Sequence, residues 1–180
     1  SVYNGFNISC YGKSNGYIHL ELSQNLAPYS FVWNGPRGFN GNTEDISGLV
    51  AGTYTVTITD VNNCSVSDTF ELDQPERFSM TIDPSVSLDG HYNINCFGAQ
   101  TGYVNLGAVN NVGAVDYLWA DGYLGSSRPN MKAGTYKIIL TDSNNCHADS
   151  TVTLTEPDPI HIRFETIDPY CPDSHDGEVV

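Results

Sequence analysis

A 14-residue pattern occurs twice in the chain and limits the possible folds more than any other feature. Residues 51–64 read AGTYTVTITDVNNC, and residues 133–146 read AGTYKIILTDSNNC, the second copy beginning 82 residues after the first. Each copy combines a turn, an alternating strand, a second turn and a cysteine. A pattern of this length, repeated at this distance, indicates a domain-sized repeat. We therefore expect a tandem array of small β domains.

Prolines mark where each repeat ends. Pro75 and Pro157 each stand eleven residues after the closing cysteine of the pattern. Beyond each proline a new alternating strand begins, so the joint between domains is only a few residues long. We predict a first domain over residues 1–75, a second over 76–157, and the start of a third, incomplete one over 158–180.

Alternation of apolar and polar residues predicts strands throughout, and no segment has helical periodicity with caps. About seven short strands per repeat, separated by Gly, Pro and Asn, predict an all-β chain of tandem immunoglobulin-like β-sandwiches. Trp33 and Trp119, each 23 residues after the first cysteine of its repeat, are expected to pack in the cores. The other inward positions expected are Tyr54, Val56, Ile58, Val66, Phe70 and Leu72, with Tyr136, Ile138, Leu140, Ala148, Val152 and Leu154 in the second repeat.

The five cysteines occupy equivalent places in the repeats. Cys10, Cys96 and Cys171 each precede a glycine by six residues, and Cys64 and Cys146 close the two copies of the pattern. This arrangement predicts one disulfide per repeat, Cys10–Cys64 and Cys96–Cys146, with the partner of Cys171 lying beyond residue 180. No two cysteines are close enough in sequence for a zinc site. Disulfides in turn indicate an oxidising compartment outside the cell.

The charge balance excludes several classes of partner. Seven Lys and Arg face 21 Asp and Glu, a formal net charge of −14. Nucleic acid and anionic membrane surfaces repel such a chain, and no apolar run approaches the roughly 18 residues of a membrane span. We expect neither nucleic-acid binding nor membrane insertion.

Candidate sites for chemistry are few. The five histidines are scattered and no motif of a hydrolase or metalloprotease is present, so we expect no catalysis and no cofactor. Calcium is the one alternative, because Asp60 with Asn62, and Asp142 with Asn144, offer hard oxygen ligands within a short loop. The same residues are also typical turn formers, since Asp and Asn bond their own backbone.

Several motifs together resemble a known family. They are Cys-x5-Gly, an aromatic strand ending in Trp, Ala-Gly-Thr-Tyr, Thr-Asp-x-Asn-Asn-Cys and a final Gln-Pro or Glu-Pro. This composite is similar to the SprB repeats of large surface adhesins in gliding Gram-negative bacteria. The resemblance implies immunoglobulin-like links in a long extracellular filament, exported by type IX secretion and moved by the gliding machinery. It implies a location at the cell surface, in association with the outer membrane.

Two functions are compatible with these observations. The first is a structural and adhesive segment of a cell-surface adhesin that serves gliding motility and surface attachment. Its partners would be neighbouring repeats of the same chain, and the secretion and gliding machinery through other regions. The alternative is a polysaccharide-binding module that uses aromatic and Gly-rich loops, with Phe39, Asn40, Asn42 and Tyr123 as candidate contacts.

Overall fold

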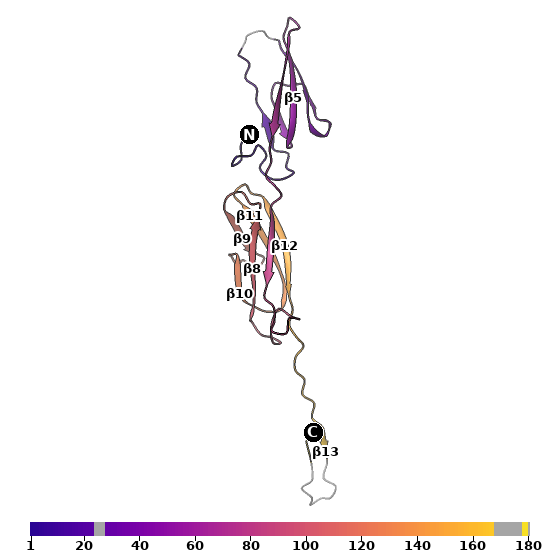
Figure 1. Cartoon of the computed structure of the whole chain (residues 1–180), viewed down its shortest axis with the longest axis vertical. Helices are drawn as coiled ribbons and strands as arrows, with labels where there is room; N and C mark the ends of the chain where they lie inside the picture. Colours follow the sequence, from indigo (N-terminus) through magenta and orange to yellow (C-terminus); the bar gives the residue numbers. More distant parts are fainter. Residues whose placement is uncertain (24–27, 168–177, 180) are drawn as a thin grey trace, which may run out of the picture.

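Two β units follow one another along the long axis of the molecule (Figure 1). The computed structural model describes residues 1–23, 28–167 and 178–179. We call residues 1–75 unit one and residues 76–157 unit two. Over the described ranges, no helix is both long enough and apolar enough to cross a membrane.

Unit one consists of a four-stranded and a two-stranded antiparallel sheet. Its elements are β1 (Gly16–Ile18), β2 (Ser30–Asn34), the 3-10 helix η1 (Pro36–Gly38), β3 (Asn40–Gly41), β4 (Ile46–Leu49), β5 (Gly52–Thr59) and β6 (Ser65–Leu72). The larger sheet has the order β3-β2-β5-β6, and β1 pairs with β4. The strand of the repeated pattern, β5, is therefore central in its sheet.

Unit two consists of two three-stranded antiparallel sheets. Its strands are β7 (Ser79–Pro84), β8 (Gly102–Val109), β9 (Val115–Trp119), β10 (Ser127–Met131), β11 (Gly134–Asp142) and β12 (His147–Leu154). The sheet orders are β10-β8-β7 and β12-β11-β9, so β11 is central as β5 is in unit one. After unit two, β13 (Thr166–Ile167) pairs with β14 (Glu178–Val179).

In each unit the two sheets bury their apolar faces against one another, which confirms the all-β, immunoglobulin-like expectation. A tryptophan lies at the centre of each core. Both indoles are fully buried, and each Nε1 donates to a loop carbonyl, Trp33 to Thr43 at 2.8 Å and Trp119 to Gly125 at 3.1 Å. Satisfying the indole N–H removes the cost of burying it. The two tryptophans are packing anchors.

The units differ at one sheet edge. β8 is eight residues long and pairs with β7, whereas β1 is three residues long and pairs only with β4. Val66, expected to face inward, is 63% exposed, while its counterpart Ala148 is 9% exposed. The described part of unit one contains no strand equivalent to β7, and Val66 is accordingly more exposed than Ala148.

An arginine closes the core of unit two at the β9–β10 loop. The Arg128 guanidinium carbon lies 5.1 Å from the ring centre of Trp119, 5.0 Å from that of Tyr123 and 5.3 Å from that of Tyr136. Its Nη1 donates to Asp121 at 2.9 Å, and this bond holds the pKa of the Asp121 carboxyl below its usual value. The Arg128 guanidinium thus packs among three aromatic rings and also forms an ion pair with Asp121.

We predict that Arg128→Met destabilises unit two by about 0.5–2 kcal/mol, because the cation–π contacts and the ion pair are both lost. Thermal unfolding of the two proteins measures the difference. Arg163→Met, which removes an exposed arginine, serves as the control and should leave the midpoint unchanged. The carboxylate of Asp121 contributes above its ordinary pKa of 3.8, so the difference should narrow as the pH falls below that value. An equal loss in both variants would contradict the assignment.

Candidate functional site

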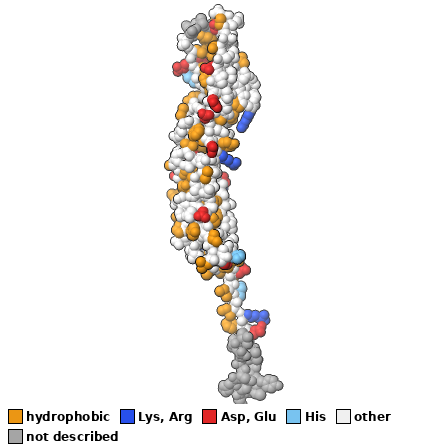
Figure 2. All heavy atoms as spheres, in the orientation of Figure 1, with side chains coloured by type: hydrophobic (Ala, Val, Ile, Leu, Met, Phe, Trp, Pro, Cys, Tyr) orange, Lys and Arg blue, Asp and Glu red, His pale blue; other side chains and the backbone are white. Residues whose placement is uncertain are grey.

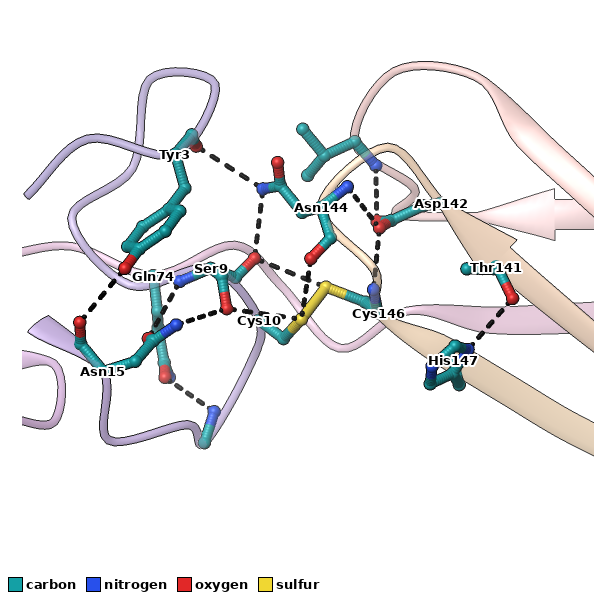
Figure 3. The surroundings of a disulfide bond; sticks show 12 residues. Tyr3, Ser9, Cys10, Asn15, Gln74, Thr141, Asp142, Asn144, Cys146 and His147 are labelled. Carbon is teal, nitrogen blue, oxygen red and sulfur yellow. Dashed lines mark hydrogen bonds between the residues drawn. A yellow bond between two sulfur atoms is a disulfide. The ribbon is translucent and has the colours of Figure 1, made fainter.

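A disulfide joins the two units. Cys10 of unit one is bonded to Cys146 of unit two, with 5.6 Å between their Cα atoms and a sequence separation of 136 (Figure 3). Cys64 and Cys96 are free thiols on the surface. The predicted pairs Cys10–Cys64 and Cys96–Cys146 are therefore wrong. Cys171 lies outside the described residues.

The strand geometry explains why the cysteines of one unit do not pair. In unit two, Cys146 precedes β12, whereas the segment before Cys96 lies at the other end of that strand, where Ile94 N donates to Thr155 O at 3.0 Å. Eight residues of strand span about 27 Å, and a disulfide needs Cα atoms within about 7 Å. Each unit thus carries one cysteine at each end.

The turn of the repeated pattern forms the rest of the joint. From the turn between β11 and β12, Asn144 Nδ2 donates to the carbonyls of Ser9 at 3.0 Å and Tyr3 at 3.4 Å. Its Oδ1 accepts from Asn4 Nδ2 at 2.5 Å. Figure 3 shows this side chain pointing from unit two toward unit one beside the disulfide. One asparagine therefore fixes the N-terminal residues of unit one on unit two.

Asp142 sets the shape of that turn. The residue is 4% exposed, and its Oδ1 accepts from Asn144 N at 2.9 Å and Cys146 N at 3.0 Å. Oδ2 accepts from Val112 N, in the loop between β8 and β9, at 3.0 Å. A carboxylate bonded to three amide groups is a strong local constraint. It orients both Asn144 and Cys146 toward unit one.

The same turn exists in unit one, between β5 and β6. Asp60 Oδ1 accepts from Asn62 N at 2.8 Å and Cys64 N at 2.9 Å. The four calcium candidates, Asp60, Asn62, Asp142 and Asn144, are therefore turn-forming residues in the structure. Among the residues that the structure describes, no three His, Cys, Asp or Glu side chains gather as a metal site would require.

The polysaccharide candidates lie in two different units and do not form one site. Phe39 packs edge-on against Tyr54, with ring centres 5.4 Å apart, and Asn40 Nδ2 donates to Gly38 O at 2.9 Å. Asn42 is exposed beside them. In unit two, the hydroxyl of Tyr123 donates to Ser127 O at 2.9 Å. Three of the four side chains therefore make contacts within their own unit.

A crevice of about 480 Å³ remains between the units beside the disulfide. It is lined by residues of both units, among them Lys13, Arg77, Phe78 and His147. Because the two units do not pack closely here, the disulfide and the Asn144 contacts make the main connection. The repeated sequence pattern contains Asn144 and Cys146, but a turn motif by itself does not reveal which surface it contacts.

We predict that Asp142→Asn destabilises the protein by about 1–3 kcal/mol, because an amide NH₂ would face one of the three backbone donors. Asp60→Asn is the matched control, because the Asp60 carboxylate accepts from two backbone donors in a partly exposed turn. Its loss of unfolding free energy should be smaller than that of Asp142→Asn. Chemical denaturation of both variants measures the costs. Equal costs would show that the docked carboxylate has no special role.

We also predict that calcium chelation leaves the thermal midpoint unchanged. The Oδ1 atoms of Asp60 and Asp142 already accept main-chain hydrogen bonds, which replaces the need for a cation. Calorimetry with added calcium and with excess chelator tests this. A higher midpoint with calcium, lost in Asp142→Asn, would establish a calcium site instead.

Comparison with known proteins gives one family. The SprB repeat model matches residues 6–38, within unit one, which confirms the resemblance for that stretch. No curated protein matches the chain.

Three solved structures are weakly similar. A C-terminal 282-residue fragment of intimin, in complex with the intimin-binding domain of the translocated intimin receptor, is 19% identical with a TM-score of 0.36; the match covers 70% of this chain and 51% of that one. Murine CEACAM1b is 15% identical with a TM-score of 0.30, covering 81% and 94% of the two chains. The amphioxus IgVJ-C2 molecule is 14% identical with a TM-score of 0.31, covering 81% and 99%. All three TM-scores are below 0.5, so the fold assignment rests on the strands described above.

Proposed function

We propose that this chain, with its SprB repeat at residues 6–38, is a stiff segment of a cell-surface adhesin, in which the two units act as links that transmit tension. Gliding motility, surface attachment and export by the type IX route belong to the same proposal, since they rest on the family resemblance. No catalytic step is part of it. Its direct partners are neighbouring units of the same chain.

The disulfide between the units is the observation that supports this function. When the ends of the chain are pulled apart, force entering at Cys10 passes through the sulfur atoms to Cys146 and bypasses the residues between them. The chain between the two cysteines, whose sequence separation is 136, would if stretched add roughly 450 Å to the length. The bond therefore keeps nearly all of both units from extending. A disulfide within each unit would leave the joint itself unprotected.

The covalent joint also limits bending. The disulfide and the linker at residues 75–78 form two separate connections between the units, and the Asn144 hydrogen bonds form a third. Two connections at different points of an interface restrict rotation more than one hinge can. Disulfides persist outside the cell, so the proposal places the segment at the extracellular surface.

We predict that Cys10→Ser lets the chain extend much further under force. Single-molecule pulling from the two ends should show an additional extension approaching 450 Å in this variant, because residues 11–145 are no longer bypassed. Cys64→Ser is the control, since it removes an exposed thiol without breaking the bond, and it should behave like the unsubstituted protein. The same total extension in all three proteins would overturn the proposal.

A further inference from the structure

The crevice between the units gathers basic residues in a chain that has few of them. Seven Lys and Arg stand against 21 Asp and Glu, and basic side chains are sparse on the face drawn in Figure 2. Two of the seven, Lys13 of unit one and Arg77 of unit two, line the crevice. Both are exposed, and within the described ranges neither has a carboxylate at ion-pair distance. The crevice therefore holds two cations that the fold does not use.

A short turn holds one side of the crevice in place. Lys13 N donates to Cys10 O at 3.1 Å, and Gly12, with a φ of 75°, lets the chain reverse there. Gly12 N also donates to the side chain of Gln74 at 2.8 Å, and Cys10 is in the disulfide. The turn is fixed at three points, so the backbone that carries Tyr11 and Lys13 is held rigidly.

The turn does not need a lysine for its own shape. In the equivalent turn of unit two, Ala99 N donates to Cys96 O at 3.1 Å, and a partly buried alanine stands in the place of the lysine. Gly98 has a φ of 71°, close to the value at Gly12. The two turns thus have the same geometry with and without the cation. The side chain of Lys13 is therefore available for a ligand.

An aromatic ring and an amide lie beside the two cations in the crevice. Tyr11 is 57% exposed, and among the described residues its ring contacts no other aromatic ring and its hydroxyl has no hydrogen-bond partner. The side-chain amide of Asn145 is exposed and has no partner within the same part of the chain. A flat ring offers a surface for the apolar face of a sugar, and an amide both donates to and accepts from hydroxyl groups.

Two acidic residues also line the crevice, and they affect an anion differently. Both carboxylate oxygens of Asp142 accept from backbone amides, which offsets its charge locally. Glu76 is exposed, and its carboxylate has no hydrogen bond or ion pair within the described ranges. Glu76 alone therefore opposes an anion that Lys13 and Arg77 attract. Charges on distant parts of the chain are screened beyond about 8 Å at physiological salt.

We propose that the crevice binds an acidic saccharide, a uronic acid unit of a polysaccharide, between the two units. Its carboxylate pairs with Lys13 and with Arg77, whose planar guanidinium matches a carboxylate. The face of the sugar ring packs on Tyr11, and Asn145 bonds its hydroxyl groups. The volume of about 480 Å³ lies within the roughly 300–1,000 Å³ of ligand pockets, which often lie between domains. The inference goes beyond the proposed stalk function, because it gives the joint a ligand.

Calorimetric titration of the chain with its disulfide intact tests the inference. The probes are tetramers of galacturonic, mannuronic and guluronic acid, and the comparison ligands are a neutral galactose tetramer and tetraglutamate. We expect at least one of the uronic acid tetramers to bind more tightly than both comparison ligands. The proposal is overturned if none of the three binds, or if the neutral tetramer or the acidic peptide binds as tightly.

A matched pair of lysine variants locates the ligand. Lys13→Gln and Lys132→Gln each remove one exposed lysine and change the net charge equally. Lys132 stands before β11, whose nine residues span about 30 Å and end at Asp142 beside the crevice. Lys13→Gln should weaken the binding of the preferred tetramer about tenfold, and Lys132→Gln should leave it unchanged. Equal effects of the two changes would overturn the site.

Further variants test the ring and the opposing carboxylate. Tyr11→Ala should weaken binding, whereas Phe97→Ala, which removes a 59% exposed ring at the equivalent place in unit two, should not. Glu76→Gln should tighten binding, because it removes the free carboxylate of the crevice. All three residues are exposed, so the variants keep the fold. Unchanged affinity in Tyr11→Ala, or no gain in Glu76→Gln, would contradict the proposal. The pulling experiment uses no ligand, so its result is independent of these.

Discussion

The buried carboxylate of Asp142 is the constraint on which the joint depends. By accepting three backbone hydrogen bonds, it holds the turn between β11 and β12 in one shape and ties that turn to the preceding β8–β9 loop. In that shape Asn144 and Cys146 both face unit one. The energy of a few hydrogen bonds to one charged group thus determines where a covalent bond can form.

The sequence predicted those parts of the fold that depend on local pattern. The alternation around Tyr54 and Tyr136 identified the central strands, and the equal spacing of Trp33 and Trp119 identified the core anchors, because burial follows from side-chain periodicity. The Asp-x-Asn-Asn-Cys turns were recognisable for the same reason. Each of these features is determined within about ten residues of chain.

The disulfide pairing could not be obtained in this way. Cys10 precedes a glycine by six residues, whereas Cys64 and Cys146 each close a copy of the repeated pattern. The repeat pattern therefore does not distinguish a Cys10–Cys64 bond within a unit from a Cys10–Cys146 bond across the joint. Only the length of β12 decides the question, since it separates the cysteines of one unit. The exposure of Val66 was equally hidden, because its pattern predicts burial without saying which strand supplies it.

The loop closed by Cys10 and Cys146 also changes what a protease can do. Exposed connections such as the linker after Pro75 are the usual places for a main-chain cut, and this linker lies inside the loop. A single cut anywhere between the two cysteines leaves both pieces attached through sulfur. The molecule remains one covalent object after such damage, and only a second cut, or a reductant, separates its ends.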